Sequence, residues 1–174
     1  MKDVEFRLIS DLMKNSRKSD RELAKAIGVS QPTVTRVRSR LEKEGIIKEY
    51  TMIPDFHKLG FEIMAVTFVK LAKDLSDEEL NELRRYSREI EKEENEAILI
   101  AMNGMGLGYN GVFISFHKNY SSYLKAIDEV RKVPNIDMSH VESFIINLVG
   151  EPHFQPLTLS AIANYLLKLK KEKL

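Results

Sequence analysis

Cysteine is absent from the 174-residue sequence, and no long apolar run occurs in it. Without cysteine there can be no disulfide bond, no thiol catalysis and no cysteine-ligated zinc. No apolar run approaches the roughly 18 residues that a membrane helix needs. The charged first residues also lack the apolar core of a signal peptide. We therefore expect a cytoplasmic protein that has no membrane partner.

Histidine is scarce, and residue patterns typical of catalytic sites are missing. No two histidines have the spacing of metal ligands, and no Ser-His-Asp order or paired carboxylate indicates a catalytic site. We interpret the histidines as structural or surface residues; they are His57, His117, His140 and His153. The sequence thus predicts a protein that is not an enzyme and that uses no cofactor or metal.

The net charge of +1 conceals an uneven distribution along the chain. Residues 1–60 carry 13 Lys and Arg against 9 Asp and Glu, whereas residues 61–174 carry 14 against 17. A basic first part beside an acidic second part suggests that only the first meets a polyanion such as nucleic acid. Chance asymmetry is the alternative. The hydrophobic fraction of 43% is enough for an ordinary core, and the length allows one domain or two small ones.

Three short amphipathic helices are predicted near the N-terminus. Apolar residues at helical spacing within residues 4–13 indicate the first. A capping box at residues 19–22 opens the second, and Gly28 ends it. Ser30 caps the third helix, which Gly45 ends. The order of a short helix, a tight turn and a second helix is that of a helix-turn-helix.

The third helix has a polar, basic face. It buries Val34, Val37 and Leu41, so the opposite face points to solvent. Short hydroxyl groups and arginines on a helix can enter the major groove, and amides at a helix N-terminus favour a phosphate. The predicted DNA-binding residues are Ser30, Gln31, Pro32, Thr33, Thr35, Arg36, Ser39, Arg40, Lys43 and Lys48. A merely solvated basic face is the alternative. Arg38 falls near the buried edge, which predicts a structural ion pair or a domain contact.

Residues 46–53 are apolar and β-branched enough to predict a strand, either the wing of the first domain or a strand leading out of it. We expect a winged helix-turn-helix domain over residues 1–53 and a linker over residues 54–61. A second domain is predicted over residues 62–150, and a C-terminal helical extension over residues 151–174. The amphipathic helix of this extension is predicted to pack on the sheet or on a partner subunit, and a membrane-surface role is the alternative.

The second domain is predicted to alternate strands and helices as β-α-β-β-α-β. Strands are expected over residues 63–71, 97–102, 111–116 and 141–149, and helices over residues 76–90 and from about residue 121 to Pro134. This order is the ferredoxin-like arrangement, an antiparallel sheet with two helices on one face, so the fold class is α+β. The other face must be covered, and a second copy of the sheet is the economical cover.

A glycine-rich loop joins the second and third predicted strands. Its Gly106-x-Gly108-x-x-Gly111 pattern is formally a dinucleotide fingerprint, but that fingerprint needs a helix after it. Because a strand follows here, we predict a hairpin whose glycines serve turn geometry. The alternative is a ligand that approaches bare backbone at a subunit interface. The effector-binding residues predicted on that basis are Gly104, Gly106, Gly108, Tyr109 and Asn110.

The run from Leu23 to Gly60 resembles the winged helix-turn-helix of the Lrp/AsnC (feast/famine) transcriptional regulators of bacteria and archaea. The matching elements are Leu23-Ala24, Gly28-Val29-Ser30, Thr33-Val34-Thr35-Arg36, Arg40-Leu41-Glu42, Glu44-Gly45-Ile46-Ile47, Tyr50 and Leu59-Gly60. The second half is similar in topology to the effector and oligomerisation (RAM) domain of that family. The resemblance implies a sequence-specific regulator that binds double-stranded DNA as a homodimer or octamer, with amino acids as effectors.

One position departs from the family pattern. The family commonly carries a glycine, two residues and then an acidic residue in this loop, and the acidic position falls here on Gly111. No carboxylate is available there to receive an effector's amino group. Two other functions stay open: an architectural DNA-binding protein without an effector, and an enzyme like the sirohaem decarboxylases. The sequence lacks the His-Asn-Tyr-x-Arg-x-His stretch that the resemblance to those enzymes would require.

Overall fold

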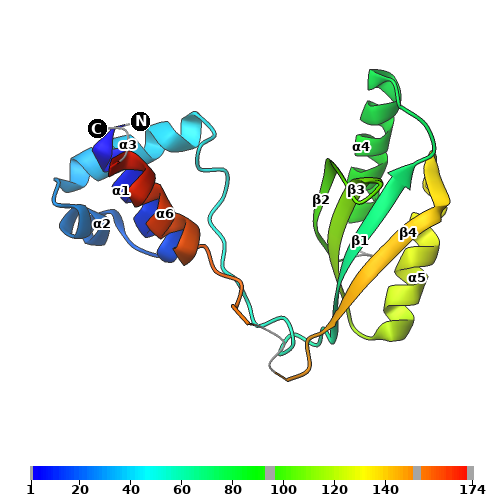
Figure 1. Ribbon diagram of the computed structural model, residues 1–174. Coiled ribbons are helices and arrows are strands. Elements are labelled where there is room, and N and C mark those ends of the chain that lie inside the picture. The colour runs from blue at the N-terminus through cyan, green and yellow to red at the C-terminus, as the bar shows by residue number, and fades with distance from the viewer. Residues whose placement is uncertain (1, 93–96, 151–153, 172–174) are drawn as a thin grey trace. The chain divides into compact units, whose positions relative to one another are not determined.

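The computed structural model describes residues 2–92, 97–150 and 154–171 (Figure 1). The chain forms two compact units, one made of residues 1–54 and 155–174 and the other of residues 55–154. The chain therefore passes from one unit to the other twice. No helix in the described ranges is both long enough and apolar enough to cross a membrane.

Four helices make up the described part of the first unit. They are α1 (Asp3–Lys14), α2 (Asp20–Ile27), α3 (Gln31–Lys43) and α6 (Ser160–Lys171). The predicted helix signals form as expected: the Ser19 amide donates to Glu22 at 2.7 Å, and Gly28 ends α2 with φ +72°. The first three helices share a core of buried side chains, namely Leu8, Leu12, Leu23, Ala24, Ile27, Val34 and Leu41.

Helix α6 packs against α1 within the same unit, and Figure 1 shows the two lying side by side. The Ser10 hydroxyl donates to the Ala163 carbonyl at 3.0 Å, and both residues are buried. The prediction that this helix packs on the sheet was therefore wrong, and its packing on a partner subunit stays a prediction. Small side chains at residues 10 and 163 let two helix backbones come close together. The apolar stripe of a helix says that it packs, but not on which element.

The strand predicted over residues 46–53 is absent from the described structure, where these residues form an irregular segment. The amides of Ile46 and Ile47 donate back to the Leu41 carbonyl at 2.9 and 3.2 Å, closing the end of α3. Farther along, the Ser16 hydroxyl donates to the Thr51 carbonyl at 2.9 Å. A strand needs a neighbouring strand to accept its backbone hydrogen bonds, and the described part of this unit supplies none.

The second unit has the predicted β-α-β-β-α-β order. Its elements are β1 (Ile63–Leu71), α4 (Asp77–Lys92), β2 (Ala97–Gly106), β3 (Tyr109–His117), α5 (Tyr120–Val130) and β4 (Ile136–Asn147). The strands pair antiparallel in the order β2-β3-β1-β4, which confirms the α+β class and the ferredoxin-like arrangement. Strands β2 and β3 are longer than predicted because they run up to a tight turn, and β4 begins earlier than predicted.

The glycine-rich loop is a hairpin, as predicted, and not a dinucleotide-binding turn. Gly106 pairs with Tyr109, and the two residues between them, Leu107 and Gly108, have φ of +54° and +83°. Two positive φ angles in a two-residue loop are the signature of a type I′ hairpin. Gly111 has a separate role, because a Cβ there would lie 2.7 Å from Val69 Cγ2.

The two faces of the sheet differ in what covers them. Ala65 is fully buried against Tyr123 and Ile127 of α5, so this face is the helix-covered one. Side chains alternate along a strand and cross-strand partners share a face, so the neighbours of Ala65 point to the other side. We call that side the open sheet face; its large apolar residues that are exposed or half-buried are Met64, Val66, Phe68, Ile100, Met102, Val112, Ile114, Phe144 and Ile146.

Candidate nucleic-acid interface

The N-terminus of α3 is exposed and carries no acidic side chain. Ser30 is the N-cap, and its hydroxyl lies 3.4 Å from the Thr33 amide and 2.8 Å from the Thr33 hydroxyl. No acidic residue occupies the first turn, whereas Arg40 and Lys43 occupy the last turn. The partial positive charge of the helix N-terminus is therefore not neutralised within the helix, and it favours an anion such as a phosphate.

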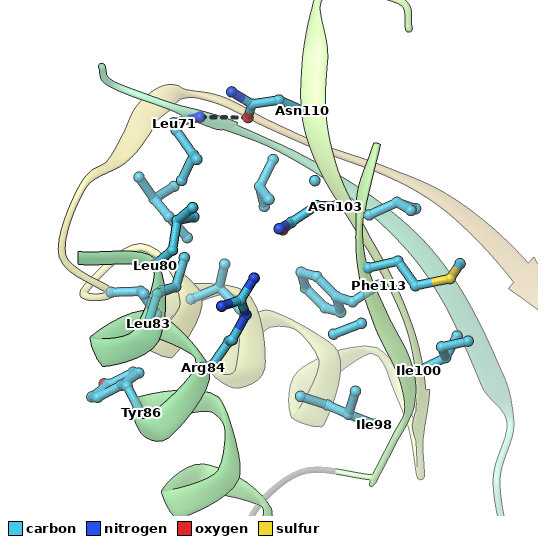
Figure 2. Close-up of a pocket in the computed structure, with 18 of the residues that line it drawn as sticks. Leu71, Leu80, Leu83, Arg84, Tyr86, Ile98, Ile100, Asn103, Asn110 and Phe113 are labelled. Atoms are coloured by element: carbon cyan, nitrogen blue, oxygen red, sulfur yellow. Dashed lines mark hydrogen bonds between the residues drawn. The ribbon is translucent and has the colours of Figure 1, made fainter. Parts of the chain in front are cut away.

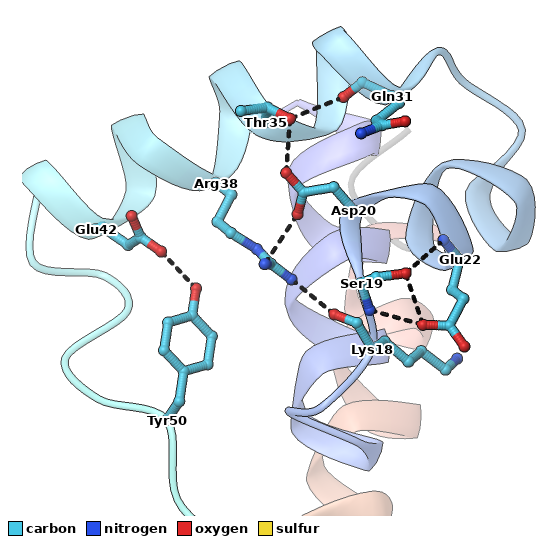
Figure 3. Close-up of polar contacts among 9 residues, drawn as sticks. All are labelled: Lys18, Ser19, Asp20, Glu22, Gln31, Thr35, Arg38, Glu42 and Tyr50. Carbon is cyan, nitrogen blue, oxygen red and sulfur yellow. Dashed lines mark hydrogen bonds and ion pairs between the residues drawn. The ribbon is translucent and has the colours of Figure 1, made fainter.

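Asp20 of α2 fixes the orientation of α3 (Figure 3). One of its carboxylate oxygens accepts a hydrogen bond from the Thr35 hydroxyl at 2.6 Å, and the other pairs with the Arg38 guanidinium at 2.9 Å. Arg38 also donates to the Lys18 carbonyl at 3.1 Å. The structural ion pair that the sequence predicted for Arg38 is thus confirmed. Thr35 is already donating to Asp20, so its hydroxyl retains only its acceptor capacity toward DNA.

Tyr50 anchors the chain that leaves α3. Its hydroxyl donates to Glu42 at 2.6 Å, and the Arg38 guanidinium lies 5.6 Å from the centre of its ring. Burial raises the pKa of Tyr50, and the hydrogen bond to Glu42 raises it further, to about 12. Tyr50 is therefore a neutral hydrogen-bond donor at physiological pH. Sequence reasoning missed the supporting roles of Asp20, Glu42 and Tyr50, because Asp20 acts between two helices and Tyr50 acts from the irregular segment that follows α3.

Arg40 belongs to an ion pair inside the unit. It contacts the carboxylate of Glu5 on α1, which is only 5% exposed, and it lies 3.7 Å from Glu44. Burial raises the pKa of Glu5, but hydrogen bonds from Arg40 and from the Lys2 amide outweigh it, so the pKa is lowered overall. Arg40 thus neutralises the charge of a buried carboxylate in this structure. A contact between Arg40 and DNA stays a prediction, and it would compete with Glu5.

Five of the predicted DNA-binding side chains are left free. Within the described ranges they are exposed and form no side-chain hydrogen bond or ion pair; they are Gln31, Arg36, Ser39, Lys43 and Lys48. Pro32 is also exposed, and Thr33 is half-buried. Three of the free residues are spaced three and four apart on α3 and so share one helix face. We call Arg36, Ser39 and Lys43 the recognition stripe.

Glu5→Gln is expected to lower the free energy of unfolding by roughly 1–3 kcal/mol near pH 7, because a charge-assisted hydrogen bond to Arg40 is lost. A carboxylate whose pKa is lowered by folding stabilises the fold above its unfolded-state pKa, and this contribution disappears as the pH falls through the folded-state pKa. The gap between wild type and variant should therefore narrow from pH 7 to pH 4. Urea unfolding measures it, with exposed Glu49→Gln as the control. A gap that is constant with pH would contradict the charge-based origin.

The predicted effector residues gather at the β2–β3 hairpin. Gly104, Gly106 and Gly108 are exposed there. The two side chains beside them already have partners. A hydrogen bond to Glu142, together with burial, raises the pKa of Tyr109, and Asn110 Oδ1 accepts the Leu71 amide at 2.8 Å. The hairpin thus offers bare backbone and turn geometry, and its role as an effector site stays a prediction.

Comparison with known proteins connects this geometry to a family. Residues 1–48 match the winged helix-turn-helix DNA-binding family model. An uncharacterised HTH-type transcriptional regulator of Pyrococcus abyssi is 37% identical over 92 residues, which are 51% of this chain and 62% of the relative. LrpC of Bacillus subtilis, an HTH-type transcriptional regulator, is 41% identical over 63 residues, which are 36% of this chain and 44% of LrpC. The matched regions thus span less than two thirds of either relative.

Solved structures extend the likeness of fold to the second unit. The structure of B. subtilis LrpC has a TM-score of 0.67 at 24% identity, over 89% of this chain and 99% of LrpC. A transcriptional regulator of Neisseria meningitidis, solved in complex with L-Met, has a TM-score of 0.68 at 15% identity, over 93% of this chain and 99% of that one. The chain thus matches a winged helix-turn-helix DNA-binding family model in its first unit, and over most of its length it shares the fold of solved transcriptional regulators.

Proposed function

We propose that the protein is a transcription regulator that binds specific double-stranded DNA sites as a homodimer and is not an enzyme. The observation that carries this proposal is the recognition stripe. Arg36 and Lys43 have no partner within the described part of the chain, whereas Arg38 and Arg40 on the same helix are both occupied. Some cationic side chains of this helix form ion pairs within the protein, and others remain unpaired at its surface. The unpaired ones are available to bind an anion.

Helix α3 enters the major groove in this proposal. Its exposed N-terminus, with Ser30 and Gln31, meets a phosphate, and Arg36 reaches base edges, where arginine pairs best with guanine. Lys43 and Lys48 contact phosphates and give binding its salt dependence. The Asp20 network supports this role because it holds Thr35 and Arg38, and therefore the helix between them, at a fixed angle on α2.

The homodimer forms through the open sheet face in this proposal. Phe144 is 67% exposed, Met102 51% and Ile100 40%, so a contiguous apolar surface lies on the side that the helices do not cover. An apolar patch of this kind on a sheet is a usual protein–protein contact. Two copies of α3 would then reach successive major grooves about 34 Å apart on a pseudo-palindromic site. Assembly of dimers into octamers, as the family resemblance implies, is an extension of the same proposal.

An amino-acid-like effector acting at the β2–β3 hairpin is part of the proposal in its finer form. The N. meningitidis relative was solved with L-Met, which supports a small-molecule effector for this fold. Gly111 stands where the family pattern places an acidic residue, so the amino group of such an effector would need another acceptor. Titration with L-methionine, read as a change in DNA affinity, tests this part alone.

Selection of bound sites from random duplex DNA, followed by footprinting, tests the main proposal. A regulator enriches one sequence and protects two discrete half-sites. Uniform protection without enrichment would instead identify an architectural protein that coats DNA. Binding should also weaken steeply between 50 and 200 mM salt as counterions are released from the phosphates. Failure to retain any duplex at 50 mM salt would refute both DNA-binding roles.

A further inference from the structure

A cavity of about 420 Å³ lies between α4 and the helix-covered face of the sheet. This volume falls within the usual range for small-molecule sites. Its walls are mostly aliphatic and aromatic, with Leu80 and Leu83 from α4 facing Ile98 and Phe113 on the strands (Figure 2). The cavity lies inside the second unit, and its lining also includes Ile100, Met102 and Val112 of the strands.

Four polar side chains line this otherwise apolar cavity, and all of them can donate hydrogen bonds; they are Arg84, Tyr86, Asn103 and Asn110. Figure 2 shows Arg84 extending from α4 toward Asn103 on β2, whereas Asn110 of β3 lies at the edge of the cavity beside Leu71. The Arg84 guanidinium donates one hydrogen bond to the Asn81 side chain, at 2.8 Å. Its other N–H groups can still donate to a ligand. The oxygen of Asn110 accepts the Leu71 amide, so the group that remains free is its amino group.

No acidic residue is among the described residues that line the cavity. A ligand that fits must therefore present an anionic acceptor to Arg84 and an apolar body to the walls. A zwitterionic amino acid would bring an ammonium group for which these walls supply no carboxylate, and burying an unpaired charge is costly. We propose that the cavity between α4 and the sheet binds an apolar monocarboxylate without a free amino group, with Arg84 as its anion contact.

This site differs from the hairpin site in place and in ligand chemistry. Ligand binding at this site is measured on the protein without DNA, so the result does not depend on whether the chain binds DNA. Octanoate serves as the probe for calorimetric titration, and octylamine and 1-octanol serve as probes that change only the head group. Octanoate should bind, and the other two should bind at least tenfold more weakly, because a charge-assisted hydrogen bond to the guanidinium is lost.

Two variants locate the binding. Arg84→Gln should weaken octanoate binding about tenfold or more, whereas Arg85→Gln, which makes the same charge change one residue along α4 and outside the cavity lining, should leave it unchanged. Ala101→Leu adds a side chain on the cavity wall and should abolish binding. Circular dichroism shows whether each variant keeps the fold.

Several outcomes would overturn the proposal. These are no octanoate binding at millimolar concentration, equal binding of 1-octanol, equal effects of the two arginine variants, or unchanged binding by folded Ala101→Leu. If Ala101→Leu fails to fold, the comparison of the two arginine variants decides alone. If the protein binds octanoate but no DNA, the proposed function is overturned and this ligand site is retained. If it binds DNA but no octanoate, the ligand site is overturned and the proposed function is retained.

Discussion

Arg36→Ala is expected to weaken binding to a selected DNA site by about ten- to a hundredfold, because an arginine that reads a base edge contributes roughly 1–3 kcal/mol. The fold should not suffer, since Arg36 is exposed and its side chain has no partner in the described part of the chain. The loss should be greatest for the selected sequence, and discrimination at one base position should relax. Fluorescence anisotropy with the selected duplex and a scrambled duplex measures both effects.

The matched control is Arg85→Ala, which removes the same charge from an exposed position on α4 in the other unit. Lys43→Ala provides a second comparison. If Lys43 contacts a phosphate, its loss should weaken all duplexes alike and reduce the slope of affinity against salt by about one ion. Equal effects of Arg36→Ala and Arg85→Ala would show that net charge, rather than the recognition stripe, is what attracts the DNA.

Phe144→Asp is expected to convert the proposed dimer into monomers at micromolar concentration. Phe144 pairs with Val66 across β4 and β1, so it lies within the open sheet face. A carboxylate there would be buried against a second apolar sheet, without a partner, and such burial costs several kcal/mol. In the monomer the same carboxylate stays in water, because this position is 67% exposed. Sedimentation equilibrium measures the shift in molecular mass.

Leu124→Asp is the control for this prediction, because Leu124 is 45% exposed on α5, on the helix-covered side. It should leave the mass unchanged. The dimer variant should also lose DNA affinity, since two half-sites can no longer be held by one particle, and the loss should exceed that of Arg36→Ala if the two α3 helices bind together. A Phe144→Asp protein that keeps the mass of wild type would place the subunit contact elsewhere.

Local signals in the sequence predicted local structure well. The capping box at Ser19 and Glu22, the glycine that ends α2 and the glycine-rich hairpin all form as expected, because each depends on residues only a few positions apart. The ferredoxin-like order followed from strand and helix periodicity. The structural role of Arg38 followed from its angle on the helix, which is also a local property.

The misses share a physical cause, which is that they depend on partners far away in the sequence. The ion pair of Arg40 was missed, because its partner Glu5 lies 35 residues away on α1; contact of Arg40 with DNA stays a prediction. The partner of α6 could not be named from its apolar stripe. The strand over residues 46–53 had suitable composition but no neighbour to pair with in the described part of its unit.

The contact between Ser10 and Ala163 also has a consequence for biosynthesis. The two residues are separated by 153 positions, and nearly the whole second unit lies between them. The ribosome therefore synthesises α1 long before α6. The surface of α1 that α6 later covers is exposed to solvent while the sheet is being synthesised. The first unit is therefore completed only after the second unit has been synthesised. The helix-turn-helix unit thus gains the helix that covers α1 only after the sheet of the second unit has been made.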